Sequence, residues 1–403
     1  MGFAWNGVIR GRGVFFRRCV GGEQNRWLKN EMRLRFQYRR YRLPLRVAVR
    51  TAHGVMTERE GVLVRLDLVD KGGSSQGISG LGEAAPVPGF GLESVDEIEA
   101  ACRSIGEWVE SEKLLETAGL DGGRLGCLRG AIGAAWADVQ RQVAAGSEAG
   151  EGARSAGAKE GPPAPYLGVA ALVPAGRAAL REVAVKADGG FRVFKWKVGV
   201  GDIADELALL DDVCAALPDG ARLRLDANGA WDRRKAERWL ERCADRPVEF
   251  VEQPIASDAR GAEDLLLGLA EDFPTPLALD ESLVGERDVE RWAGAGWRGV
   301  FVVKPSLLGD VAGAMDLLAR AKADVVFSSA LETAVGARSA LRVAFAWAGR
   351  GASLPAQPKP RALGFGVWPL YADARFDGPY AAPFLRAEDM ERIDVEAVWN
   401  ALS

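Results

Sequence analysis

Three carboxylates recur at the ends of short β-rich runs in the second half of the chain. Asp226 ends the run RLRLD, Glu252 ends VEFVE, and Asp280 follows LAL. If these runs are parallel strands of one barrel, their carboxyl ends meet at a single mouth. Three unpaired carboxylates there would repel each other, and a divalent cation would remove that repulsion. Oxygen ligands without His or Cys favour Mg²⁺, with Mn²⁺ as a possible substitute.

Lysines occupy the same kind of position on two other runs. Lys195 and Lys197 lie two residues apart in KWK, so on a strand they share one face, and Lys304 ends the run GVFVVK. Two adjacent ammonium groups near a dication disfavour each other's protonation, so we expect a lysine pKa to fall toward neutrality. A partly neutral lysine is a competent general base. With a metal to bind the substrate carboxylate, this predicts proton abstraction α to that carboxylate.

Regular alternation of β-rich and amphipathic helical segments is the pattern expected to position these groups. It predicts an α/β fold, a TIM-like (β/α)7β barrel over 165–355 that holds the active site, with an eighth strand near 352–355. The β-rich runs lie at 166–172, 192–198, 222–227, 248–252, 277–281, 299–304 and 324–329.

Residues 32–145 precede the barrel with a different pattern. Alternating segments from Met32 and at 61–70 read as antiparallel strands, with a Gly/Ser turn at 72–75. Helical patterns follow at 94–117 and 124–145. Strands followed by helices predict an α+β domain.

Three further segments complete the predicted organisation. Residues 146–164 are rich in Gly, Ala, Ser and Glu and read as a flexible linker. Residues 356–403 form a tail that is expected to pack on the α+β domain. Residues 1–31 begin with a basic stretch without acidic residues to Val20. That stretch is either a targeting segment or the result of a start codon assigned too early.

Composition excludes several classes of protein. The 403 residues are 48% apolar and 27% charged with net charge −4, which argues against disorder and against binding to nucleic acid. No apolar run approaches the length of a membrane helix. The single histidine, His53, excludes a multi-histidine metal site, and five scattered cysteines fit a reducing, cytoplasmic location. The expected partner is a small-molecule carboxylate substrate; the oligomeric state stays open.

The motifs resemble those of the enolase superfamily, in particular its muconate lactonizing subgroup. Three other segments are similar to the o-succinylbenzoate synthase family: RTAHG (50–54), GLGEAAPVPGFGLES (80–94) and SSALET (328–333). The superfamily motifs are KWK (195–197), LRLDANGAW (223–231), VEQP (251–254), LDES (279–282) and VVKP (302–305).

The resemblance implies that the protein is a lyase of menaquinone or phylloquinone biosynthesis. It implies Mg²⁺-dependent syn dehydration of 2-succinyl-6-hydroxy-2,4-cyclohexadiene-1-carboxylate to 2-succinylbenzoate. It also implies that the α+β domain over 32–145, with the C-terminal tail, is a capping domain whose loops near 50–56 and 86–92 close over the barrel mouth. Lys197 would remove the α-proton and return it to the departing hydroxyl, and Lys304 would stabilise the enediolate from the opposite face.

The same resemblance implies roles for the remaining site residues. Asp226, Glu252 and Asp280 would bind Mg²⁺. Lys195 would hold the substrate and lower the pKa of Lys197. The implied substrate-side contacts are Arg224 near the base, and Ser328 and Ser329 at the succinyl side.

Other reactions remain open on the same residues. N-acylamino acid racemase, dipeptide epimerase and muconate cycloisomerase would use the same metal and lysines. A Schiff-base aldolase would leave the three carboxylates without a role. A metal-binding or scaffold protein without activity is the non-enzymatic alternative.

Overall fold

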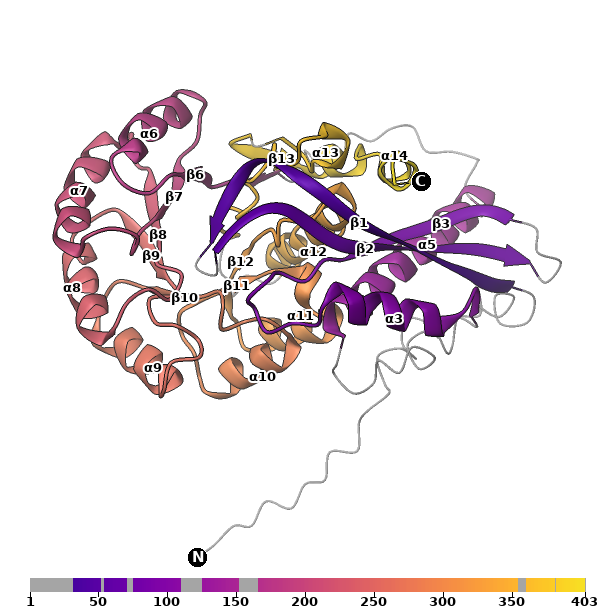
Figure 1. The fold of residues 1–403 in the computed structure, drawn as a ribbon, viewed down its shortest axis with the longest axis horizontal. Coiled ribbons are helices and arrows are strands. Elements are labelled where there is room, and N and C mark those ends of the chain that lie inside the picture. Colours follow the sequence, from indigo (N-terminus) through magenta and orange to yellow (C-terminus); the bar gives the residue numbers. More distant parts are fainter. Residues whose placement is uncertain are drawn as a thin grey trace, which may run out of the picture.

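The computed structural model describes residues 32–51, 54–70, 75–109, 125–151, 166–353, 360–380 and 382–402. The predicted extension 1–31 lies outside this part of the chain. Within the described residues, no helix combines the length and apolar character needed to cross a bilayer. Figure 1 shows an antiparallel sheet with its helices lying beside a curled parallel sheet.

The antiparallel sheet carries the order β3-β2-β1-β4. In its first strand, buried Leu34 and Phe36 alternate with exposed Arg33 and Arg35, as expected of a strand with one face on a core. The first two strands pair antiparallel, as predicted from this alternation. The strands are β1 (Met32–Thr51), β2 (Gly54–Asp70), β3 (Ser75–Ala84) and β4 (Trp108–Val109).

The helices of this part begin where predicted but end elsewhere. The predicted helix 94–117 is α3 (Val95–Ile105), which stops because Gly106 takes a left-handed φ of 79°. The second helix, α5 (Gly126–Glu151), continues into the predicted linker 146–164, whose Ala and Glu residues favour helix. The rest of that linker lies outside the described residues.

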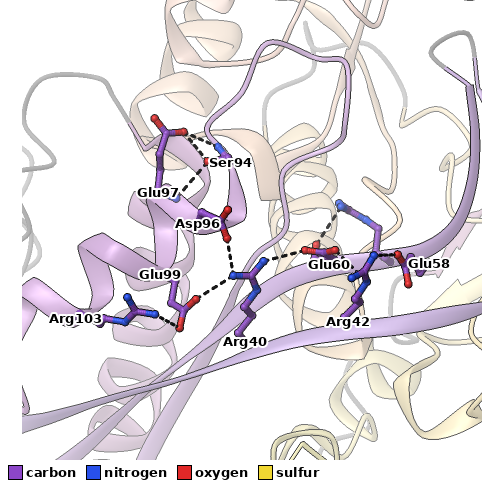
Figure 2. Close-up of polar contacts among 10 residues, drawn as sticks. Arg40, Arg42, Glu58, Glu60, Ser94, Asp96, Glu97, Glu99 and Arg103 are labelled. Atoms are coloured by element: carbon purple, nitrogen blue, oxygen red, sulfur yellow. Dashed lines mark hydrogen bonds and ion pairs between the residues drawn. The ribbon is translucent and has the colours of Figure 1, made fainter.

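Helix α3 is tied to the sheet through Arg40 of β1. Figure 2 shows its guanidinium between Asp96 and Glu99 of α3, at 2.6 and 3.0 Å, and Glu60 of β2, at 3.1 Å. Ser94 caps the N-terminus of the helix. Exposed pairs of this kind each contribute under about 1 kcal/mol, so the network orients α3 more than it stabilises the fold.

Close packing of α5 on β3 depends on two glycines. A Cβ on Gly82 would lie 1.9 Å from the Ala131 carbonyl oxygen, and one on Gly80 would lie 1.9 Å from that of Ala135. Any larger residue at either position would push the helix off the sheet.

The second part of the chain is the predicted barrel of parallel strands. The seven-stranded sheet has the order β12-β11-β10-β9-β8-β7-β6, and every neighbouring pair is parallel. Its strands are β6 (Ala171–Val173), β7 (Val193–Lys197), β8 (Arg222–Asp226), β9 (Val248–Glu252), β10 (Leu277–Leu279), β11 (Val300–Val303) and β12 (Asp324–Phe327).

Helices cover the outside of this sheet, as Figure 1 shows for α6 to α10. Their buried apolar residues join the largest hydrophobic core of the molecule. The helices are α6 (Ala178–Asp188), α7 (Ile203–Ala216), α8 (Arg233–Cys243), α9 (Ala262–Asp272), α10 (Glu286–Gly294), α11 (Val311–Arg320) and α12 (Ala334–Ser353).

The barrel is closed at a different place from the one predicted. Leu363 and Gly364 make parallel bridges to Val169 and Ser328 and so join the two edges of the sheet. The eighth strand predicted near 352–355 is wrong, because α12 continues through Ser353. A short apolar run after a helical pattern does not by itself distinguish strand from helix.

The C-terminal tail contacts both parts. β13 (Phe384–Arg386) pairs with β5 (Tyr166–Gly168) beside the barrel. Trp399 stacks under the guanidinium of Arg39 of β1, whose carbon lies 4.3 Å from the ring centroid. The remaining tail elements are the 3-10 helix η4 (Ala374–Phe376), α13 (Ala387–Glu391) and α14 (Val395–Asn400); a second 3-10 helix, η3 (Pro305–Leu307), follows β11.

Candidate active site at the barrel mouth

The carboxyl ends of neighbouring strands bring the predicted residues into one region. Lys197 ends β7, Asp226 ends β8 and Glu252 ends β9, and the three are aligned in the parallel register. Asp280 and Lys304 directly follow β10 and β11. The sequence pattern therefore places them on consecutive strand ends.

Lys195 joins two of the three carboxylates. Its Nζ lies 2.9 Å from Asp226 Oδ2 and 2.6 Å from Glu252 Oε1. Burial alone would lower the pKa of Lys195, but these two carboxylates outweigh it and raise the pKa. Burial raises the pKa of Glu252, while Lys195 opposes that rise.

Lys304 pairs with the third carboxylate, that of Asp280. Burial lowers the pKa of Lys304 to about 8, while Glu252 acts against this shift. The ring of Phe90, from the predicted loop 86–92, lies 5.4 Å from Lys304 Nζ. A capping-domain side chain thus reaches the barrel mouth. The other predicted loop, near 50–56, contains Ala52 and His53, which lie outside the described residues.

Asn228 and Glu281 add further buried oxygens beside Asp226. Asn228 donates its side-chain amide to Glu281 Oε1 at 3.0 Å, and its backbone N–H to Asp226 Oδ1 at 3.2 Å. Burial, followed by the charge of Asp226, raises the pKa of Glu281 to about 7. Asn228 Oδ1 and Glu281 Oε2 are buried without a hydrogen-bond partner.

This donor set fits a divalent cation in its chemistry. Among the described residues, no three acidic, Cys or His side chains are gathered closely enough to hold a metal as they stand. Lys195 and Lys304 instead pair with the three carboxylates. The buried oxygens without a partner are the hard ligands that Mg²⁺ takes. A cation would take over the charge balance that the two ammonium groups now supply.

Arg224 lies in the barrel interior. It is almost fully buried, donates to Glu249 Oε2 at 2.7 Å and stacks over Phe250 at 4.9 Å. Arg361 binds the same Glu249. These contacts engage the guanidinium within the barrel and do not favour a direct contact with substrate.

The hydroxyl groups of Ser328 and Ser329 are also engaged internally. Ser328 donates to the Gly364 carbonyl oxygen at 3.3 Å, and Ser329 donates to Glu332 Oε2 at 3.0 Å. Burial raises the pKa of Glu332 to about 7. Both hydroxyls hold the loop that follows β12, so a substrate contact from them remains a prediction.

Two residues at the site were not predicted to act there. Phe90 lies in a segment that the sequence marked only as a loop. Leu172 of β6 is in register with Lys195 and is 40% exposed, whereas Ala171 and Val173 beside it are buried in the outer core. Leu172 therefore lies on the inner face of the barrel. The alternation of side chains along β6 shows that Leu172 faces away from Ala171 and Val173, but the sequence alone does not show which of the two faces lines the barrel interior.

Comparisons with known proteins agree with this architecture. Residues 178–355 match the "Enolase C-terminal domain-like" family, and residues 32–120 match "MenC, N-terminal domain". The structure of the L-Ala-D/L-Glu epimerase from Bacillus subtilis superimposes with a TM-score of 0.66 at 22% identity, covering 87% of this chain and 95% of that one. Cap and barrel together define an enzyme fold of the enolase superfamily.

More similar relatives narrow the class. The o-succinylbenzoate synthase of Thermosynechococcus vestitus is 36% identical over 344 residues, 83% of this chain and 92% of the relative. A crystal structure of o-succinylbenzoate synthase from Thermosynechococcus elongatus, described with magnesium in its active site, has a TM-score of 0.71 at 32% identity and covers 91% of this chain and 99% of that one. The chain belongs to the o-succinylbenzoate synthase family and is a lyase.

Proposed function

We propose that the chain dehydrates 2-succinyl-6-hydroxy-2,4-cyclohexadiene-1-carboxylate to 2-succinylbenzoate, as a step of menaquinone biosynthesis. One observation carries this proposal: at the mouth formed by five neighbouring strands, two lysine ammonium groups are paired with three carboxylates. Such a site can bind a carboxylate substrate through a metal and move a proton at the adjacent carbon.

Asp226, Glu252 and Asp280 would hold the metal. Their oxygen-only chemistry favours Mg²⁺ and allows Mn²⁺, and a related structure is described with magnesium. When bound, the cation stabilises the negative charge that develops on the substrate carboxylate. The lysines now paired with these carboxylates would then be available to the substrate.

The lysines would carry the proton steps. Lys197 takes the proton from C1, the carbon that bears the carboxylate. The electron pair of that C–H bond becomes the second bond between C1 and C6 as the C–O bond of the 6-hydroxyl breaks. Lys197 then gives the same proton to the departing hydroxyl, which leaves as water from the same face. Lys304 stays protonated and faces the developing charge, and the desolvation that lowers its pKa also strengthens that interaction.

The remaining residues would position the substrate. Lys195 lies two residues before Lys197 on the same face of β7, so it can hold a substrate oxygen beside the base. Arg224 acts from the barrel interior by holding Glu249, beneath this pair. Ser328 and Ser329 present the loop that would face the succinyl group.

We also propose a cytoplasmic location. All four cysteines in the described part of the chain are free thiols, and three of them, Cys102, Cys127 and Cys243, are buried. Burial raises the pKa of each buried thiol, which makes these side chains unreactive packing groups. Such thiols are typical of a reducing compartment.

The experiment offers wild-type protein two substrates with Mg²⁺ present. Loss of the ultraviolet absorbance of the cyclohexadiene carboxylate, suppressed by a chelator, is the expected result. N-acylamino acids in D₂O form the second arm, followed by NMR. Exchange of their α-proton, with the cyclohexadiene untouched, would replace the dehydratase by a racemase on the same residues.

A further inference from the structure

Arg59 of β2 is a buried cation whose hydrogen bonds in the described chain all go to backbone carbonyl oxygens. It is 1% exposed. Its guanidinium donates to the carbonyls of Ala85 and Pro86 in the capping domain, the latter at 2.6 Å. It also donates to those of Ala330, at 3.1 Å, and Leu331, at 3.3 Å, in the barrel.

These carbonyls belong to two segments that border the barrel mouth. Ala85 and Pro86 lead into the loop that carries Phe90 to Lys304. The segment 330–331 follows the two serines at the end of β12. A single side chain therefore joins the loop above the mouth to the loop at its rim.

Only arginine has the geometry for this arrangement. Its planar guanidinium presents five N–H donors in a fixed fork, so it can bind carbonyls on opposite sides at once. Lysine keeps the charge but concentrates its three donors on one nitrogen. Burying a cation is costly unless it is well solvated by other dipoles, and carbonyl oxygens from both domains provide that solvation.

Glu83 of β3 also holds this barrel segment, but as a hydrogen-bond acceptor where Arg59 is a donor. It accepts hydrogen bonds from the backbone N–H groups of Thr333 and Gly336, both at 2.9 Å, and from the Tyr41 hydroxyl at 2.5 Å. These N–H groups lie at the N-terminal end of α12, where a carboxylate is favoured. The capping domain thus fixes segment 330–336 in two ways: Arg59 binds backbone carbonyl oxygens of the segment, and Glu83 binds its backbone N–H groups.

We propose that Arg59 is a positioning residue that sets substrate binding by fixing the 86–92 loop and the 328–333 loop relative to each other. It does not touch the groups that move protons, so its loss should act on substrate binding more than on the chemical step. This inference rests on the proposed function for its kinetic part and on the structure alone for its conformational part.

The test compares Arg59→Lys and Arg59→Met with Arg338→Met. Arg338 of α12 also joins the barrel to the capping domain, by a 2.5 Å contact with Asp138 of α5, and neither residue belongs to the 86–92 or the 328–333 loop. We expect KM to rise at least about tenfold in both Arg59 variants, with kcat changed less, and KM to stay at the wild-type value in Arg338→Met. Arg59→Lys controls for the loss of charge.

Hydrogen–deuterium exchange on the same full-length proteins supplies the second readout. Exchange in 86–92 and 328–333 should be at least about tenfold faster in both Arg59 variants and unchanged in Arg338→Met. Unchanged exchange in Arg59→Lys, or an equal rise of KM in all three variants, would overturn the proposal. If exchange is faster in both Arg59 variants but wild-type protein does not consume the cyclohexadiene, the proposed function is refuted and the positioning role of Arg59 stays in place.

Discussion

Charge pairing governs the site at the scale of single residues. Lys195 is held by Asp226 and Glu252, and Lys304 by Asp280, so each of these five charged groups has a counter-charge. The sequence indicated which residue types meet there, because strand ends of a parallel barrel converge. It did not indicate which lysine pairs with which carboxylate, since that depends on burial and on distances of a few ångströms.

Replacing one proposed ligand should weaken the metal site. We expect Asp226→Asn to bind Mg²⁺ at least about tenfold more weakly than wild type by isothermal titration calorimetry, because a charged oxygen ligand is lost. Asp232→Asn, which alters only the N-terminal cap of α8, is the matched control. Equal affinities in Asp226→Asn and wild type would remove Asp226 from the ligand set.

The buried carboxyl of Glu332 should make stability depend on pH. Burial raises its pKa from the ordinary 4.5 to about 7, so the folded state favours the protonated form. The contribution of Glu332 to the free energy of unfolding is therefore fully present below pH 4.5, and it is lost as the pH rises from 4.5 through 7. The free energy of unfolding of Glu332→Gln, taken relative to that of wild type, should therefore increase by up to about 3 kcal/mol over this pH window. Urea unfolding at pH 5 and pH 8 measures this, and parallel profiles would contradict it.

Strand order and helix boundaries show how far the sequence leads at the scale of elements. Six of the seven barrel strands lie within the predicted runs 192–329, because β-rich runs and amphipathic helices alternate regularly. Closure at Leu363 and Gly364 was missed, since two bridging residues give no periodic signal. Arg59 was missed too, because its role depends on four carbonyls far apart in the chain.

The contact between β3 and α5 offers a test of packing. Gly82→Ala would place a Cβ 1.9 Å from the Ala131 carbonyl oxygen, so we expect the free energy of unfolding to fall by at least about 2 kcal/mol. Gly133→Ala, in the same helix with no atom within 4 Å of the added Cβ, is the control. It should leave stability unchanged or raise it by up to about 1 kcal/mol. Equal urea midpoints in the two variants would refute the close contact.

At the scale of the whole molecule, cap, barrel and tail form one connected structure. The tail contacts the antiparallel sheet through Trp399 and the barrel through β13, and Glu83 and Arg59 join the cap to the barrel. A site that lies between two parts requires both, which is why the sequence shows its chemical residues in one half and its covering loops in the other.

This organisation predicts that residues 1–31 contribute nothing to the reaction. The first strand and the match to the N-terminal family both begin at residue 32. A protein that begins at Met32 should keep kcat/KM within about twofold of the full chain, and its melting temperature should be unchanged. A large loss of either would show that the extension belongs to the fold.

The most direct measurement follows the absorbance of the cyclohexadiene carboxylate with Mg²⁺ and Lys197→Ala, beside wild type and Lys186→Ala. Lys186 of α6 pairs with Glu182, at 3.7 Å, outside the candidate active site, and controls for the loss of a lysine. The account predicts full activity in Lys186→Ala and a fall in kcat of at least about 10³-fold in Lys197→Ala, with a folded protein by circular dichroism. Turnover by Lys197→Ala near the wild-type rate would contradict it.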